Sequence, residues 1–161
     1  MSGTLNANPE FLRRAIALAT ANVTSGNGGP FGAVIVRDGK IVGEGANSVT
    51  TTLDPTAHGE VNAIRAACAA LGTFTLNGCQ LYTSCEPCPM CLAAAYWARI
   101  DRIFYGCKAA DAARAGFDDA YLYDELCKDH AARAIPSEQL LGDEAWSSFA
   151  AWIASPIKVE Y

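Results

Sequence analysis

The chain has 161 residues, of which 51% are hydrophobic and 18% charged, and its net charge at pH 7 is −5. This length is typical of one domain, and the composition excludes a disordered or low-complexity chain. No apolar run approaches the roughly 18 residues of a membrane-spanning helix, and the polar start of the chain lacks the features of a signal peptide. We therefore expect a single globular domain over residues 1–161 with no membrane partner.

Charged residues are distributed unevenly. Residues 1–108 carry eight Lys/Arg and seven Asp/Glu, whereas residues 109–161 carry four and ten. Nucleic-acid binders present a basic face because phosphate neutralisation supplies much of their affinity, and Arg13-Arg14 is the only adjacent basic pair here. A nucleic-acid partner is therefore disfavoured. The seven cysteines are an odd number without an export signal, which favours the reducing cytoplasm over a disulfide scaffold.

The first predicted elements are a helix and a hairpin. Asn8 is typical of a helix N-cap and Pro9 of the first helical position, and apolar residues follow at helical spacing. A buried strand is predicted over 31–37. Asp38-Gly39 indicates a tight turn, and the returning strand is expected over 40–47.

Helices and strands then alternate. A helix is predicted from Asp54-Pro55-Thr56 to Gly72, a strand over 79–83, an alanine-rich helix over 87–98 and a strand over 102–106. A strand–helix–strand unit of this length implies a right-handed crossover and parallel pairing. The pattern predicts an α/β sandwich.

The remaining third gives weaker signals. Helices are predicted over 109–115, 119–127 and 145–154. A short strand is expected near 134–135.

Two motifs carry the chemistry: His58-Gly59-Glu60 and Pro87-Cys88-Pro89-Met90-Cys91. One imidazole and two thiolates form a three-ligand set for zinc that leaves a fourth position for water. Cys88 and Cys91 are three residues apart at a helix start, so both sulfurs lie on one face, where the helix dipole stabilises thiolates. If the two helices pack side by side, His58 in the first turn of its helix meets the cysteine pair.

Glu60 is the candidate proton carrier. It lies two residues beyond His58 and therefore on another face of the helix, from which it can reach a water at the metal. A carboxylate there can take a proton from water and return it to the substrate and leaving group.

Other interpretations of the cysteines exist. The Cys88–Cys91 pair alone could be a redox pair or half of a structural zinc site. Cys85 could supply a fourth ligand, but we expect it to be a non-ligand at a strand end, because a fourth protein ligand would displace the catalytic water.

Several residues could form pocket walls. Phe31 could stack on a flat heterocycle, although an aromatic residue at a strand start is more often part of the core. Asn47 ends a strand and could reach the site or form a turn, and Asp118 and Asp119 could contact a ligand or cap a helix.

The terminal segment 156–161 has an alternating pattern. Ile157, Val159 and Tyr161 alternate with charged residues, so one face of the tail is apolar. Read alone, such a tail would fray, but burial of its apolar face on a partner would stabilise a homodimer.

The two motifs, with Thr83-Ser84-Cys85-Glu86, resemble the cytidine-deaminase-like superfamily of zinc nucleobase deaminases. Within it, the chain resembles the bacterial guanine deaminases over nearly its whole length. The shared features are Gly28–Val34, Tyr96–Arg99, Ala115–Asp119, Ile135-Pro136 and the terminal Glu160-Tyr161. Gly59 differs from the alanine that is usual in that family.

This resemblance implies a three-layer α/β/α sandwich around a mixed five-stranded sheet. It implies one Zn²⁺ per chain bound by His58, Cys88 and Cys91, with Glu60 as proton shuttle. It also implies a homodimer that exchanges a C-terminal segment of about 145–161, which places Tyr161 near the partner's metal. The implied substrate contacts would come from Phe31, Asn47, Gly59, Trp97, Asp119 and the partner's Tyr161.

The implied activity is hydrolytic deamination of guanine to xanthine and ammonia. Alternatives are another base or nucleoside (cytosine, isocytosine, an aminotriazine or guanosine), tRNA adenosine, and an inactive zinc-stabilised dimerisation module. The acidic C-terminal third disfavours tRNA, and Glu60 disfavours the inactive module, because a structural zinc site has no need of it.

Overall fold

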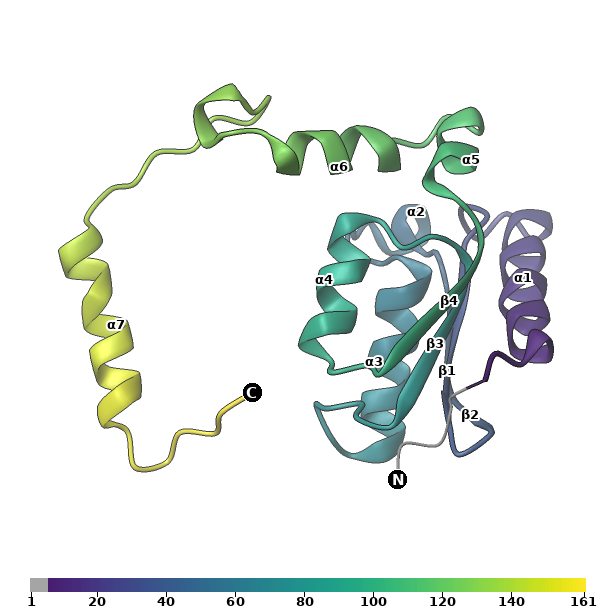
Figure 1. The fold of residues 1–161 in the computed structure, drawn as a ribbon, viewed down its shortest axis with the longest axis horizontal. Coiled ribbons are helices and arrows are strands. Elements are labelled where there is room, and N and C mark those ends of the chain that lie inside the picture. Colours follow the sequence, from purple (N-terminus) through teal and green to yellow (C-terminus); the bar gives the residue numbers. More distant parts are fainter. Residues whose placement is uncertain (1–5) are drawn as a thin grey trace. The chain divides into compact units, whose positions relative to one another are not determined.

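The computed structural model describes residues 6–161, whose helices and strands are labelled in Figure 1. These residues form two compact units divided after Tyr123. The strands are β1 (Gly32–Arg37), β2 (Lys40–Ala46), β3 (Cys79–Cys85) and β4 (Arg102–Cys107). The helices are α1 (Pro9–Thr24), α2 (Val49–Thr52), α3 (Gly59–Leu71), α4 (Pro89–Trp97), α5 (Ala109–Arg114), α6 (Asp119–Cys127) and α7 (Gly142–Ala154). The second unit begins at Asp124 within α6 and includes a 3₁₀ turn over His130–Ala132 and α7.

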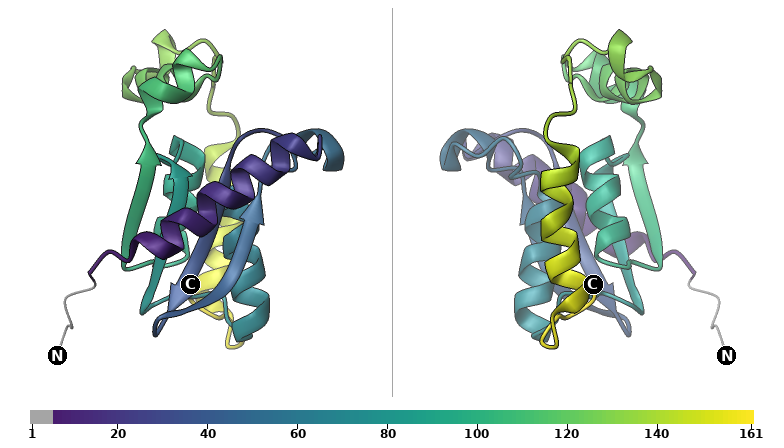
Figure 2. Two further views of the ribbon diagram at one scale, coloured as in Figure 1. Left: turned by 90° about the vertical axis from the view of Figure 1, so that its right-hand side faces the viewer. Right: turned by 90° about the vertical axis from the view of Figure 1, so that its left-hand side faces the viewer.

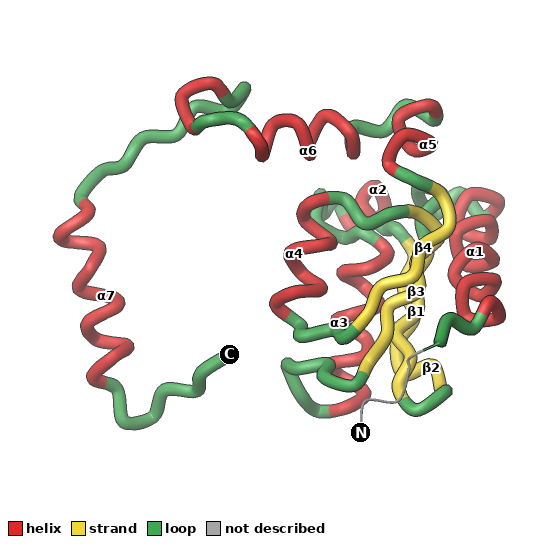
Figure 3. The backbone as a smooth tube through the Cα atoms, viewed as in Figure 1, coloured by secondary structure: helices red, strands yellow, loops and turns green. Residues whose placement is uncertain are grey.

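All four strands lie in the first unit, in the order β2-β1-β3-β4 (Figure 3). The hairpin β1–β2 is antiparallel, β1 also pairs antiparallel with β3, and β3 pairs parallel with β4. The predicted hairpin and parallel crossover are thus confirmed.

The expected fifth strand at 134–135 was wrong: the sheet of residues 6–161 has four strands. The backbone N–H of Ala134 donates to Glu125 Oε2 at 2.7 Å instead of to a strand, and Pro136 has no N–H to offer.

Helices cover both faces of the sheet, which confirms the three-layer sandwich (Figure 2). Val34, Val36 and Tyr82 project from β1 and β3 toward α1. Ala33 and Ile35 alternate with them and project toward α3 and α4. Because β1 and β3 are covered on both faces, they are continuous buried runs rather than half-polar strands.

The start of α1 agrees with the prediction, since Asn8 Oδ1 accepts a hydrogen bond from the backbone N–H of Glu10. The start of α3 does not. Residues 54–56 form a turn, in which the Thr56 backbone N–H and hydroxyl both donate to Asp54 Oδ1, and the helix begins at Gly59. The aspartate therefore closes a turn rather than capping a helix. His58 is the N-cap instead of a first-turn residue.

Two glycines of β2 allow α3 to approach the sheet closely. A Cβ on Gly45 would lie 2.3 Å from the carbonyl oxygen of Gly59 and 2.4 Å from the backbone nitrogen of Ala63. A Cβ on Gly43 would lie 2.5 Å from the Ala63 carbonyl oxygen. Since Gly59 is the first residue of α3, this contact fixes the helix end that carries His58 and Glu60.

We expect Gly45→Ala to lower the free energy of unfolding by about 1–3 kcal/mol, because its Cβ would overlap the backbone of α3. Alanine is intrinsically better than glycine in a strand, so the loss would come from the close packing. Urea unfolding followed by circular dichroism measures it. Lys40→Ala, an exposed change in the same strand, is the control and should stay within about 0.5 kcal/mol. An equally stable Gly45→Ala protein would contradict the close approach.

Candidate metal and substrate site

Two helix N-termini bring three metal-binding side chains together. His58 is the N-cap of α3, Cys88 is the N-cap of α4, and Cys91 lies in the first turn of α4. The two helices pack against each other, as the sequence analysis required. The Nδ1 atom of His58 is 3.6 Å from Cys88 Sγ and 3.5 Å from Cys91 Sγ, and all three donor atoms lie within 4.8 Å of one another.

These separations suit a tetrahedral zinc ion. Zn–S bonds of about 2.3 Å and Zn–N bonds of about 2.0–2.1 Å place S and N about 3.5 Å apart at a tetrahedral angle. Both cysteines are buried and His58 is half-buried, so the donors are shielded from competing ligands. Cys85, at the end of β3, is not part of this cluster, and its Sγ instead lies 3.7 Å from the carbonyl oxygen of Lys108.

The three side chains of the cluster shift one another's pKa values. A hydrogen bond from Cys91 and a second contact with His58 lower the pKa of Cys88 to about 4, and the contact with Cys88 raises the pKa of His58. The same hydrogen bond to Cys88, together with burial, raises the pKa of Cys91. By contrast, burial raises the pKa of Cys85 to about 12, so its thiol stays protonated. The negative charge is thus concentrated where a cation would sit.

Glu60 lies in the first turn of α3 and is only 4% exposed. Burial raises the pKa of its carboxyl group. The Thr83 hydroxyl on β3 donates to Glu60 Oε1 at 3.1 Å and holds the carboxylate in one orientation. A buried carboxyl with a raised pKa, beside a metal-ligand cluster, is suited to proton transfer near neutral pH.

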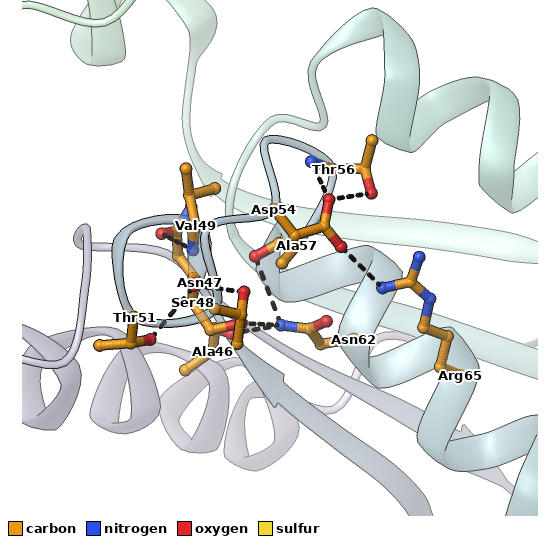
Figure 4. Close-up of polar contacts among 11 residues, drawn as sticks. Ala46, Asn47, Ser48, Val49, Thr51, Asp54, Thr56, Ala57, Asn62 and Arg65 are labelled. Atoms are coloured by element: carbon orange, nitrogen blue, oxygen red, sulfur yellow. Dashed lines mark hydrogen bonds and ion pairs between the residues drawn. The ribbon is translucent and has the colours of Figure 1, made fainter.

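The loop between β2 and α3 is held by Asn62 (Figure 4). Its Nδ2 donates to the carbonyl oxygen of Ala46 at 2.8 Å, to Ser48 Oγ at 3.1 Å and to the carbonyl oxygen of Ala57 at 3.4 Å. Ala46 ends β2 and Ala57 precedes His58, so one side chain from α3 closes the loop that carries Asn47.

Asn47 is oriented by backbone donors. Its Oδ1 accepts from the N–H groups of Gly29 at 3.4 Å and Val49 at 3.3 Å, which leaves its amide nitrogen as the group able to donate to a ligand. Behind it, buried Asn22 of α1 donates through Nδ2 to the carbonyl oxygens of Gly29 and Asn47, both at 2.8 Å. These hydrogen bonds therefore fix Gly29 and Asn47 to each other and to α1.

A cavity of about 320 Å³ opens at this cluster. Phe31 and Phe117 meet edge to face on its wall, with ring centroids 4.7 Å apart. Asp119 also faces the cavity, and burial raises the pKa of its carboxyl group. The lining residues are Gly29, Phe31, Asn47, Val49, Thr50, His58, Glu60, Glu86, Cys88, Phe117 and Asp119.

The structure does not bring every predicted site residue to the cavity. Gly59 lies behind the wall, where an added Cβ would be 3.1 Å from the carbonyl oxygen of Phe31. Trp97 is the last residue of α4, whereas Cys88 and Cys91 are at its start, and Trp97 does not line the cavity of the described chain. Tyr161 belongs to the second unit.

The sequence analysis missed several site residues. Glu86 and Phe117 line the cavity, and Thr83, Asn22 and Tyr123 hold its parts in place. Glu86 belongs to the motif Thr83-Ser84-Cys85-Glu86, and Phe117 belongs to the segment Ala115–Asp119. Their place in these motifs was therefore a signal that could have identified them as site residues. Asn22 had no signal, because a polar residue in an amphipathic helix is usually solvated.

Comparisons with known proteins agree with this geometry. Residues 5–107 match the family described as the cytidine and deoxycytidylate deaminase zinc-binding region. The guanine deaminase of Bacillus subtilis is 56% identical over 151 residues, covering 94% of this chain and 97% of that protein. A crystal structure of B. subtilis guanine deaminase superposes with a TM-score of 0.92 at 54% identity, covering 97% of this chain and 99% of that one. The tRNA-specific adenosine deaminase of Agrobacterium fabrum is 48% identical but covers only 48% of this chain and 51% of its own.

The chain therefore belongs to the zinc-binding cytidine and deoxycytidylate deaminase family. It is a zinc-dependent aminohydrolase. Among residues 6–161, no helix combines the length and the apolar character needed to cross a bilayer.

Proposed function

We propose that the protein deaminates guanine to xanthine, with water consumed and ammonia released. The observation that carries this proposal is the extent of the similarity to B. subtilis guanine deaminase, 94% of this chain. That similarity continues beyond residue 107, where the family match ends, and so includes the segment with Phe117 and Asp119. The similarities to tRNA deaminases extend over 47% to 63% of the chain.

His58, Cys88 and Cys91 are the proposed ligands of one zinc ion per chain, as their spacing and charge support. Bound zinc supplies Lewis-acid activation of water. Glu60 accepts a proton on its buried carboxylate as water adds to C2 of the base, and delivers it as the amino group leaves. Both thiols must stay reduced to act as ligands, which supports a cytoplasmic location.

The proposed substrate contacts follow from the cavity wall. Asn47 donates from its amide nitrogen to an acceptor atom of the purine, since its oxygen is already occupied. Asp119 accepts from N–H groups at the opposite edge of the base, and Phe31 packs on the ring. Gly59 supports Phe31 at close range.

Ammonia release from a panel of compounds tests this function. We expect guanine to be the best substrate among guanine, guanosine, cytosine, isocytosine and an aminotriazine. Glu60→Gln, a near-isosteric change, should keep zinc and lose at least about 10²–10⁴-fold in turnover, because it removes the proton carrier.

Two outcomes would contradict these assignments. A preference for another compound would overturn the choice of guanine. Near-normal ammonia release from zinc-replete Glu60→Gln would overturn the role of Glu60.

The zinc ligands can be tested by metal analysis. We expect Cys88→Ala to lose most of its zinc, because two ligands cannot retain the ion in competition with solvent and chelators. Cys85→Ala is the matched control, since this cysteine lies three residues earlier outside the cluster, and it should keep one zinc per chain. The reverse pattern would show that the ligand set is different.

We further propose that the chain acts as a homodimer. Helix α4 carries no charged residue, yet Tyr96 and Trp97 at its end are 72% and 62% exposed. In the second unit, α7 exposes Trp146, Phe149 and Ile153. An exposed apolar surface of this kind marks an interaction site, and burial on a second copy would remove it from water.

In the proposed dimer, residues 1–161 form one deaminase domain whose segment of about 145–161 is exchanged with the partner. Tyr161 would then complete the partner's pocket. The tail supports this because Ile157 and Val159 are 86% and 62% exposed within their own chain. A closed pocket would exclude bulk water from the reacting groups.

The exchange can be tested by complementation. Subunits lacking 156–161 and Glu60→Gln subunits should each be nearly inactive. Their mixture should recover activity, because an intact tail would then cover an intact Glu60 site in the heterodimer.

A subunit carrying both changes, mixed with the tail-deleted one, is the control and should recover nothing. If heterodimers of the first pair form without regaining activity, the tail is not exchanged.

A further inference from the structure

The segment that presents Phe117 and Asp119 to the cavity is weakly buried. Among residues 108–123, only Ala112 is fully buried, while Phe117, Asp119 and Tyr123 are half-buried. The other cavity wall, with Phe31 and Asn47, continues directly from the central sheet. Specific contacts rather than core packing must therefore hold the segment 108–123 in place.

Two side-chain hydrogen bonds tie this segment to Glu86 and Pro87, the two residues before Cys88. At its start, the Ala109 backbone N–H donates to Glu86 Oε2 at 2.9 Å. At its end, the Tyr123 hydroxyl donates to the carbonyl oxygen of Pro87 at 2.7 Å. The acceptor is well fixed, because Pro87 is buried and its ring restricts the backbone.

Tyr123 is placed to control Asp119. Both lie on α6, four residues apart, and so on the same face of the helix one turn from each other. Burial raises the pKa of Tyr123, which keeps the phenol protonated and able to donate. The Tyr123 hydroxyl thus ties α6 to the loop that leads into α4.

We propose that Tyr123 is a positioning residue: its hydrogen bond to Pro87 docks α6 beside the zinc ligands and so holds Asp119 against the edge of the base. The inference rests on the proposed function, in which Asp119 accepts from the substrate. Tyr123 does not line the cavity formed by the described residues, and its hydroxyl bonds the carbonyl oxygen of Pro87 rather than a proposed zinc ligand. Its effect is transmitted along one turn of helix, so it should appear only where Asp119 can still bind the base.

A double-mutant cycle tests this. Tyr123→Phe removes only the hydroxyl and should lower kcat/KM for guanine about three- to tenfold, the range expected for one hydrogen bond. Asp119→Asn should lower kcat/KM for guanine more than Tyr123→Phe does. In the Asp119→Asn protein, adding Tyr123→Phe should change kcat/KM by less than about twofold, because the group that the hydroxyl positions is already impaired.

The same cycle is measured as dissociation constants for guanine in Glu60→Gln protein, where turnover is blocked, so that a nearly inactive Asp119→Asn variant still gives a reading. Zinc content should remain one per chain throughout. Tyr121→Phe is the matched control, since Tyr121 lies on the same helix and is 49% exposed, and it should behave as wild type.

An equal loss from Tyr123→Phe in both backgrounds would overturn the inference, and so would loss of zinc or the absence of any effect. Failure of the proposed function is distinguished from failure of this inference by the wild-type protein, which would then release ammonia faster from another base than from guanine. The cycle is then run on that base.

Discussion

The site depends on one constraint: two helices must begin at the same edge of the sheet and lie close enough to share a metal ion. The donor atoms of His58, Cys88 and Cys91 lie within 4.8 Å of one another, although they come from α3 and α4. Small residues make this possible. Ala63 and Ala67 of α3 pack on the sheet opposite Gly43 and Gly45, so the helix backbone approaches to a distance that a larger residue would prevent. Both helix N-termini then favour the anionic forms of the groups beside them.

The same edge also gathers groups that line the cavity. Phe31 precedes β1 and Asn47 follows β2, and these antiparallel neighbours begin and end at one edge. Cys85 ends β3 at this edge, and β4 leads from it into the segment with Asp119. The side chains of Asn22 and Asn62 satisfy the carbonyl groups of the loops that meet here. A buried loop needs such partners, because an unpaired carbonyl away from water is costly.

Sequence patterns predicted correctly those features that depend on interactions between neighbouring residues. The hairpin turn at Asp38-Gly39, the N-cap Asn8 and the spacing of Cys88 and Cys91 each follow from a few neighbouring residues, and the structure has them. The start of α3 was misplaced, because Asp54 serves a turn as readily as a helix cap. The strand expected at 134–135 required a neighbouring strand, which a sequence pattern cannot supply. Asn22 and Tyr123 acquire their roles only from residues far away in the sequence, so no local pattern could indicate them.

The division between metal site and substrate contacts has a physical basis. Zinc requires fixed donor distances, and the three side chains whose donor atoms cluster at such distances lie within 5–107, the part that matches the deaminase family. Phe117 and Asp119 lie outside that part, on short elements fastened by individual hydrogen bonds rather than by the core. None of the three donor atoms belongs to this segment, since His58, Cys88 and Cys91 lie on α3 and α4. A fold arranged in this way can keep one hydrolytic centre while the segment after β4 adapts it to a different base.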